Sequence, residues 1–305
     1  MNLTHACRQQ AVDFISIQAR PLERARYAYH FTGASAAEVL AALAPYQNAD
    51  GGFGQGLEPD FRLPGSSPIC TSIALQILTA IKAPADHPLI IGTVHYLLAT
   101  FDKALQAWPI IPAHDNTAPH APWWDYSADF AARTNDYQAN PRAEIVGHLY
   151  AYAALLPTGW LDELGAAGVD WLDGRETLEM HDLLCYVRMV ESAEIPSEMR
   201  DTLITRLNPV IERAVVRDPA QWAGYCLQPL QVASSPRSPF YPLLAGAVAE
   251  NLDYLIARQT PAGCWPTTWA WGNFPEIWPI AEREWQGVLT LDALLKLKAF
   301  GRLEE

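Results

Sequence analysis

The apolar residues of the chain recur with the spacing of amphipathic helices. Val39, Leu40 and Leu43 share one face of a segment that begins with the capping box Ser35-Ala36-Ala37-Glu38. Similar patterns predict further helices that start at Ser67 and at Asn140, and others over residues 178–193, 196–216, 239–258 and 281–300. No segment alternates between polar and apolar residues as a half-buried strand does. The pattern therefore predicts an all-α protein.

Three of these helices are expected to be buried on more than one side. Ser67-Pro68 and Asn140-Pro141 each place a proline at the start of a helix, where the missing N–H costs nothing. The helix after Ser67 is apolar on more than one face, and the helix over residues 281–300 carries a broad apolar stripe. We interpret these three as inner helices of a layered helical array.

A short sequence occurs twice, once near each end of the chain. Residues 47–53 read Gln-Asn-Ala-Asp-Gly-Gly-Phe and residues 259–265 read Gln-Thr-Pro-Ala-Gly-Cys-Trp, so both have the spacing Gln-x3-Gly-x-aromatic. Each copy follows one apolar helical segment and precedes another. The repeated unit is therefore a helical hairpin, which can bury its apolar face only against neighbouring hairpins.

This spacing resembles the QW-type repeat of the terpenoid cyclase and protein prenyltransferase superfamily. The stretches 56–60, 120–124 and 284–287 are similar to those of small bacterial prenyltransferase-like proteins. The resemblance implies an (α/α) toroid of about 10–14 helices, with inner and outer helix layers around a central aromatic-lined cavity. It implies that residues 1–305 form a single domain.

Composition and charge restrict the partners and the compartment. Half of the 305 residues are hydrophobic and 18% are charged, which suits a large core. The formal net charge of −13 argues against nucleic acid and anionic membranes as partners. Five widely spaced cysteines predict reduced thiols, and residues 1–20 lack the apolar core of a signal peptide. We expect a cytoplasmic protein without a transmembrane segment, and the oligomeric state stays open.

Most of the tryptophans lie in two long connections, over residues 104–140 and 263–281. Indole faces stabilise cations by about 0.5–2 kcal/mol each and also stack on sugar rings. Each tryptophan could instead wedge a loop onto helix ends, but the clustering favours a binding cavity. The candidate substrate-binding tryptophans are Trp123, Trp124, Trp269, Trp271 and Trp285.

Four acidic residues are candidates for proton chemistry or binding. Glu58 and Asp60 leave the first repeated turn, Glu284 lies near the start of the last helix, and Asp125 follows the Trp123-Trp124 pair. A carboxyl group among aromatic rings has a raised pKa and can donate a proton. Glu58, Asp60 and Glu284 are therefore candidate catalytic acids, and Asp125 a candidate binding residue. The competing interpretation is that all four are solvated acids near helix ends.

Two histidines stand out. His120 lies beside two indoles in a loop and could act as an acid or a base near neutral pH, so we count it as a candidate catalytic residue. An ordinary hydrogen-bonded loop histidine is the competing interpretation. His148 follows Glu144 by four residues on a helix, which suits a binding residue oriented by a carboxylate or a surface pair.

The known catalytic motifs of the superfamily are missing. The chain has no Asp-x-Asp-Asp motif, no Asp-Asp-x-x-Asp motif and no Asp two residues before Cys70. A glycine-rich nucleotide loop is also missing. We therefore expect no cofactor and no metal, although His181 and Cys185 could share a helix face.

The leading functional hypothesis is an enzyme that acts on an apolar or isoprenoid-like small molecule by acid/base chemistry in the central cavity. One alternative is a carbohydrate-active toroid, either a glycoside hydrolase or a polysaccharide lyase, in which tryptophans stack on sugars and paired carboxylates cleave the linkage. Another is a non-catalytic binding protein on the same fold. The sequence leaves the choice between these three open.

Overall fold

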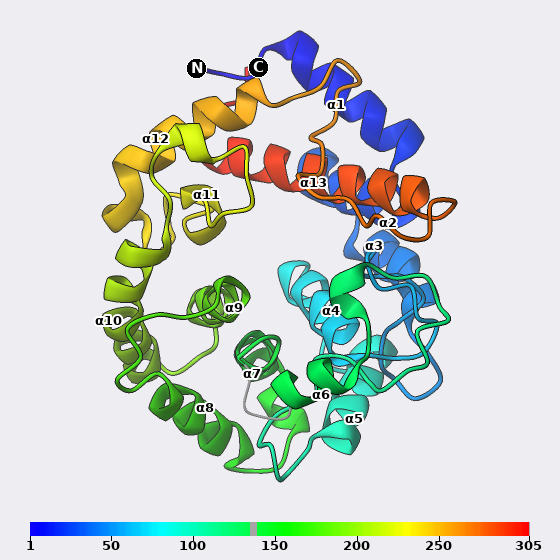
Figure 1. The fold of residues 1–305 in the computed structure, drawn as a ribbon, viewed down its shortest axis with the longest axis vertical. Helices are drawn as coiled ribbons and strands as arrows, with labels where there is room; N and C mark the ends of the chain where they lie inside the picture. The colour runs from blue at the N-terminus through cyan, green and yellow to red at the C-terminus, as the bar shows by residue number, and fades with distance from the viewer. Residues whose placement is uncertain (135–138, 305) are drawn as a thin grey trace. The chain divides into compact units, whose positions relative to one another are not determined.

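The computed structural model describes residues 1–134 and 139–304 (Figure 1). Residues 135–138, which belong to the connection expected over 104–140, lie outside the described residues, as does Glu305. Within the described part, the chain forms thirteen α-helices, and its extended pairings are isolated bridges. The expectation of an all-α protein is therefore confirmed.

The contacts divide the chain into two compact units. Unit 1 comprises Met1–Ala42 and Ile211–Glu305, and unit 2 comprises Leu43–Val210. The boundaries fall inside α3 (Ala36–Leu43) and α10 (Ser197–Ala214). The single domain and the ring expected over residues 1–305 stay predictions.

Unit 1 contains the helices from both ends of the chain. They are α1 (His5–Gln18), α2 (Pro21–Tyr27), the π-helix η1 (Ala28–Thr32), most of α3, the end of α10, the 3₁₀-helix η5 (Pro219–Gln221), α11 (Pro229–Val232), α12 (Tyr241–Ala257) and α13 (Trp278–Ala299). Helices α1 and α2 pack on α13, and α11 packs on α12. The two ends of the chain meet in a short parallel bridge between Leu3 and Leu303 (Figure 1). The first and last segments therefore stabilise the same unit.

Unit 2 is a set of helices around α7. Its elements are the 3₁₀-helix η2 (Ala44–Tyr46), α4 (Pro68–Ala80), α5 (Pro88–Thr100), η3 (Pro122–Trp124), α6 (Ala128–Thr134), α7 (Arg142–Leu149), η4 (Tyr150–Leu155), α8 (Trp160–Trp171), α9 (Met180–Glu191) and most of α10. Helix α7 packs on α4, α8 and, most extensively, α9. Gly147 makes the close approach to α9 possible, because a Cβ there would lie 2.7 Å from the Met189 Cα.

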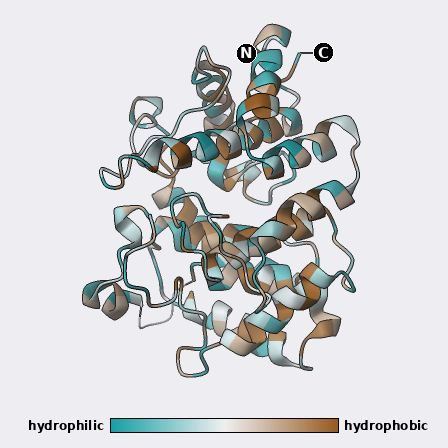
Figure 2. Ribbon diagram, turned by 90° about the vertical axis from the view of Figure 1, so that its right-hand side faces the viewer, coloured by the Kyte–Doolittle hydropathy of each residue, from teal (hydrophilic) through white to brown (hydrophobic). Residues whose placement is uncertain are grey.

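The predicted helices lie where the structure has helices, but several of them begin or end at other residues than predicted. The helix after Asn140 ends at Leu149, and a 3₁₀ segment follows it. Helix α13 begins at Trp278, before the expected Ala281, and the connection over 104–140 contains α6. Figure 2 shows hydrophobic and hydrophilic residues alternating along the same helices, as the amphipathic pattern requires.

The two Gln-x3-Gly-x-aromatic turns have the same hydrogen bonds. The Gln47 Nε2 donates to the Gly51 carbonyl at 2.9 Å and to the Leu89 carbonyl of α5 at 3.0 Å. The Gln259 Nε2 donates to the Gly263 carbonyl at 3.0 Å and to the Cys7 carbonyl of α1 at 2.8 Å. Each glutamine thus closes its own turn and holds the first turn of another helix.

The glycine and the aromatic residue are equivalent as well. Gly51 and Gly263 have φ of 88° and 87°, and each lies directly against the backbone of the helix that its glutamine holds. The Phe53 N–H donates to the Thr71 hydroxyl of α4 at 3.1 Å, and the Trp265 N–H donates to the Thr290 hydroxyl of α13 at 3.1 Å. The repeat in the sequence is therefore a repeat in the structure.

The second copy of the turn uses the first helix of the chain. In unit 2 the held helix α5 follows α4 directly. In unit 1 the glutamine that precedes α13 holds α1, which takes the corresponding place. The repeat in unit 1 is thus completed by the N-terminal segment.

Candidate functional site

Three neighbouring helices of unit 2 bring polar side chains together inside the protein. These side chains are regularly spaced, at i, i+4 and i+7 on α4, at i and i+4 on α7, and at i and i+3 on α9, so each set shares one helix face. We call them the polar cluster, and its members are Ser72, Gln76, Thr79, Glu144, His148, Cys185 and Arg188. Buried polar groups are costly, so a cluster of them is a candidate functional site.

The centre of the polar cluster is an ion pair between α7 and α9. The Arg188 Nη1 lies 2.5 Å from the Glu144 Oε2, and the Gln76 Nε2 donates to the Glu144 Oε1 at 3.0 Å. The Glu144 side chain is 2% exposed and that of Arg188 is 39% exposed. Burial alone would raise the Glu144 pKa, but Arg188 and hydrogen bonds, including one from Ser72, hold it below its ordinary value. Glu144 is therefore a buried carboxylate.

Cys185 adds a thiol to this pair. Its Sγ lies 3.4 Å from the Glu144 Oε2 and 3.6 Å from the Asn140 Oδ1. Burial and the neighbouring Glu144 raise the pKa of Cys185 well above its ordinary value. Cys185 is therefore a protonated hydrogen-bond donor and is poorly suited to act as a nucleophile.

His148 occupies the other end of the polar cluster, where α7 faces α4. Its Nδ1 lies 3.0 Å from the Thr79 Oγ1, which also lies 2.8 Å from the Leu75 carbonyl oxygen. A carbonyl oxygen can only accept, so the single hydroxyl proton of Thr79 goes to Leu75. On this geometry we assign the ring hydrogen of His148 to Nδ1, which donates it to Thr79. This arrangement leaves the His148 Nε2 with a lone pair.

The His148 Nε2 is buried, and within residues 1–134 and 139–304 it has no hydrogen-bond partner. Burial, opposed by Glu144 and assisted by Arg188, lowers the pKa of His148 to about 4. The imidazole is therefore neutral at pH 7. A buried acceptor without a partner costs about 1–3 kcal/mol unless a ligand or water satisfies it.

We expect the low pKa of His148 to make the protein less stable in acid. The unfolded chain binds the proton near pH 6.5, whereas the folded protein binds it near pH 4. The contribution of His148 to the free energy of unfolding is therefore fully present above pH 6.5. It falls by about 3 kcal/mol as the pH drops to 4. Urea unfolding at several pH values should show this loss in the wild type and not in His148→Gln. Parallel curves for the two proteins would contradict the assignment.

The other sequence-based candidates in unit 2 gather at a different place, where residues 58–62 meet residues 118–126. Main-chain bonds join the segments, from the Arg62 N–H to the Pro119 carbonyl at 3.1 Å and from the Ala121 N–H to the Asp60 carbonyl at 2.8 Å. Glu58 and Asp60 are buried there, at 7% and 3% exposure. Trp124 packs on Phe61 with ring centroids 5.9 Å apart, while Trp123 is 43% exposed.

His120 is buried under Asp125 at this junction. Its Nδ1 lies 2.6 Å from the Ala118 carbonyl oxygen and its Nε2 lies 2.7 Å from the Asp125 Oδ1. The His120 side chain is 2% exposed and that of Asp125 is 56% exposed. A ligand would meet the carboxylate before the imidazole, so this geometry favours a residue that anchors the loop. The catalytic role of His120 stays a prediction.

The remaining sequence-based candidates lie in unit 1. Trp269 and Trp285 pack edge to face with centroids 5.3 Å apart, and Trp271 packs against Trp278 at 5.6 Å. Trp271 is buried, and Glu284 is partly exposed beside Trp285 in α13. The tryptophans expected to share one cavity therefore belong to two units, and Trp124, Trp269, Trp271 and Trp285 contact other aromatic rings.

The residues that sequence reasoning missed are those that complete the ion pair and orient the histidine. Glu144 and His148 were recognisable as an i,i+4 pair, but Gln76, Thr79 and Arg188 belong to helices far away in the sequence. One signal for Arg188 was available, since a charged residue follows the buried run Leu183–Val187 on α9. A buried run interrupted by arginine indicates a buried partner of opposite charge.

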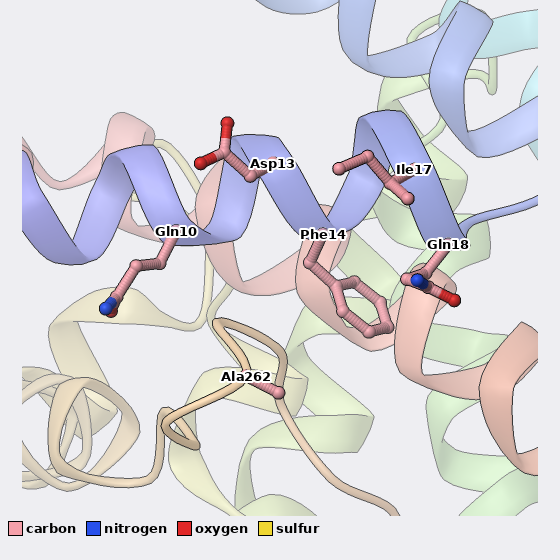
Figure 3. A pocket seen from close by; sticks show the side chains of 6 residues that line it. All are labelled: Gln10, Asp13, Phe14, Ile17, Gln18 and Ala262. Carbon is pink, nitrogen blue, oxygen red and sulfur yellow. The ribbon is translucent and has the colours of Figure 1, made fainter.

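Metal ligands and surface depressions are the other candidates for a site in the described chain. Residues 1–134 and 139–304 contain no group of three or more His, Cys, Asp or Glu that could hold a metal ion. A shallow depression of about 420 Å³ lies between α1 and the turn at Ala262 (Figure 3). Its lining residues are Gln10, Asp13, Phe14, Ile17, Gln18 and Ala262. Asp13 is its single ionisable residue, so the depression has little capacity for chemistry.

Two further findings bear on the function. None of the helices in the described residues is both long and apolar enough to span a bilayer. Comparison of the chain with protein-family models, with curated proteins and with solved structures gives no match. The function is therefore inferred from the residues of this chain.

Proposed function

We propose that the polar cluster is the ligand-binding part of an enzyme that acts on an apolar or isoprenoid-like small molecule carrying a hydroxyl or similar donor. The observation that carries this proposal is the buried His148 Nε2, which presents a lone pair and lacks a partner within the described residues. A hydroxyl group of the substrate would supply the missing hydrogen.

The chemistry of the cluster suits binding and orientation first. Because its pKa is about 4, His148 stays neutral and accepts a hydrogen bond over the whole physiological pH range. Glu144, four residues earlier, favours the imidazolium that would form if the donor's proton moved to His148. The cluster can therefore orient a hydroxyl group and polarise its O–H bond.

The repeated turn supports the substrate class and the toroid that we propose with it. The same hydrogen bonds occur around Gln47 and Gln259, as expected for repeated helical hairpins. In unit 1 the first helix completes the repeat that the last helix begins, as a cyclic array requires. The isoprenoid character of the substrate follows from the resemblance of these turns to the toroidal superfamily.

Titration of the protein with farnesol tests the proposal, with a mixture of β-linked oligosaccharides as a parallel probe. We expect farnesol to bind and His148→Phe to weaken the binding about tenfold, because one buried hydrogen bond is lost. His181→Phe, at an exposed position of α9, serves as the control and should bind like the wild type.

The alternatives predict different results in the same experiment. Binding of oligosaccharides without farnesol would favour a carbohydrate-active protein. Farnesol binding with no product detectable by mass spectrometry would favour a non-catalytic binding protein. Equal farnesol binding by His148→Phe and the wild type would contradict the proposed role of His148.

A further inference from the structure

The Thr79 hydroxyl on α4 lies against the backbone of its own helix. Its Oγ1 lies 2.8 Å from the Leu75 carbonyl oxygen and 3.3 Å from the Gln76 carbonyl oxygen. Both carbonyl oxygens can only accept a hydrogen bond, so the hydroxyl hydrogen is used up whichever of them receives it. Threonine commonly bonds to the preceding turn of a helix in this way. The Thr79 Oγ1 therefore has only lone pairs to offer to a further neighbour.

That neighbour is the imidazole of His148 on α7, which packs on α4. The His148 Nδ1 lies 3.0 Å from the Thr79 Oγ1. The lone pairs of Oγ1 favour the neutral ring that carries hydrogen on Nδ1, because the other neutral form would require the hydroxyl to give up its bond to the helix carbonyls. The bond at Nδ1 thereby decides what Nε2 can do.

Thr79 is the hydrogen-bond partner that the described residues provide for the His148 ring. Glu144 and Arg188 influence the ring through their charges. The Glu144 oxygens are bonded to the Gln76 Nε2 at 3.0 Å and to the Arg188 Nη1 at 2.5 Å. The charged pair thus joins the helices, whereas Thr79 contacts the ring nitrogen itself.

We propose that Thr79 is the positioning residue that makes the His148 Nε2 an acceptor, and that it thereby sets the specificity of the site for a hydroxyl group over a carbonyl group. This inference rests on the proposed function for the class of ligand. A hydroxyl group donates its hydrogen to Nε2, whereas a carbonyl oxygen would meet the Nε2 lone pair with its own. A site built to bond a hydroxyl group rejects the analogue without it, because a buried polar group is then left unpaired.

Nitrogen-15 NMR of the His148 ring at pH 7 tests the role of Thr79 without any ligand. In Thr79→Val a methyl group replaces the hydroxyl, so Nδ1 loses its acceptor. We expect the ratio of the Nδ1–H form to the Nε2–H form to fall about tenfold, because one buried hydrogen bond is lost. Thr79→Ser retains a hydroxyl and should restore the wild-type ratio.

A matched control variant is available on α10. The Thr202 Oγ1 donates to the Glu198 carbonyl at 2.8 Å, so it makes the same bond to the preceding turn at an exposed position. Thr202→Val should leave the His148 ring in its wild-type form. An unchanged ring in Thr79→Val, or an equal change in Thr202→Val, would overturn the role of Thr79.

Binding of farnesol and of its aldehyde, farnesal, tests the specificity. The two molecules share a carbon skeleton, but the aldehyde can only accept a hydrogen bond. We expect the wild type and Thr79→Ser to prefer farnesol, and the preference to fall at least tenfold in Thr79→Val. An unchanged preference in Thr79→Val would overturn the specificity. No binding of farnesol to the wild type would overturn the proposed function as well, whereas the NMR result would still assign Thr79 as the residue that positions the His148 hydrogen.

Discussion

Gly51→Ala is expected to destabilise the protein by about 4 kcal/mol or more, a loss seen when a substitution combines strain with a clash. Gly51 has a φ of 88°, which a residue with a Cβ rarely adopts. A Cβ at this position would lie 2.2 Å from the Gly92 carbonyl oxygen in α5. That oxygen belongs to the helix backbone, so the clash cannot be relieved by rotating a side chain. Urea unfolding of the purified variant measures the loss.

Two other glycines make this prediction sharper. Gly263, the equivalent residue of the second turn, has the same backbone conformation, and a Cβ there would lie 2.3 Å from the Gln10 carbonyl oxygen. Gly263→Ala should therefore lower the free energy of unfolding by a similar amount. Gly33 also has a positive φ, of 77°, but no atom lies within 4 Å of its Cβ position. Gly33→Ala should therefore cost about 1–2 kcal/mol, from backbone strain alone. Equal losses at Gly33 and Gly51 would show that helix contact is unimportant.

Arg188→Met should destabilise the protein by about 3–5 kcal/mol, because it leaves the Glu144 carboxylate buried without its counter-ion. Glu144→Gln should lower the free energy of unfolding by less than Arg188→Met does. Its partner Arg188 is 39% exposed and can be hydrated, whereas the Glu144 side chain is 2% exposed and cannot. Denaturant unfolding of both single variants at pH 7 measures this asymmetry.

The double variant Glu144→Gln/Arg188→Met completes the thermodynamic cycle. We expect it to recover most of the stability lost in Arg188→Met, since no buried charge remains. Additive losses from the two substitutions would mean that the ion pair does not couple α7 to α9.

The sequence was sufficient for the helical class and for the repeated turn, because both depend on local patterns. Apolar periodicity identified α4, α10, α12 and α13 from residues close together in the chain. The turns around Gly51 and Gly263 were recognisable because the spacing of glutamine, glycine and aromatic residue is set by hydrogen bonds within seven residues. The partner helices α5 and α1 could not be inferred, since those contacts join distant segments.

The candidate site was predictable only in part, for the same reason. His148 and Glu144 were visible as neighbours on one helix face, but the pKa of His148 depends on burial by α4 and on Arg188 from α9. His120 and Asp125 were prominent because of the aromatic residues around them. The structure shows that Phe61 packs against both His114 and Trp124, that His114 packs on His120, and that His120 is buried under Asp125.

The protonation state of the His148 ring in the folded protein tests the proposed role of this residue most directly. Two-dimensional ¹H–¹⁵N NMR of the imidazole nitrogens at pH 7, with His148→Gln for assignment, measures it without any ligand. We expect a neutral ring with hydrogen on Nδ1 and an unprotonated Nε2. A ring that carries hydrogen on Nε2, whether neutral or charged, would contradict the proposal that His148 offers a lone pair to a substrate.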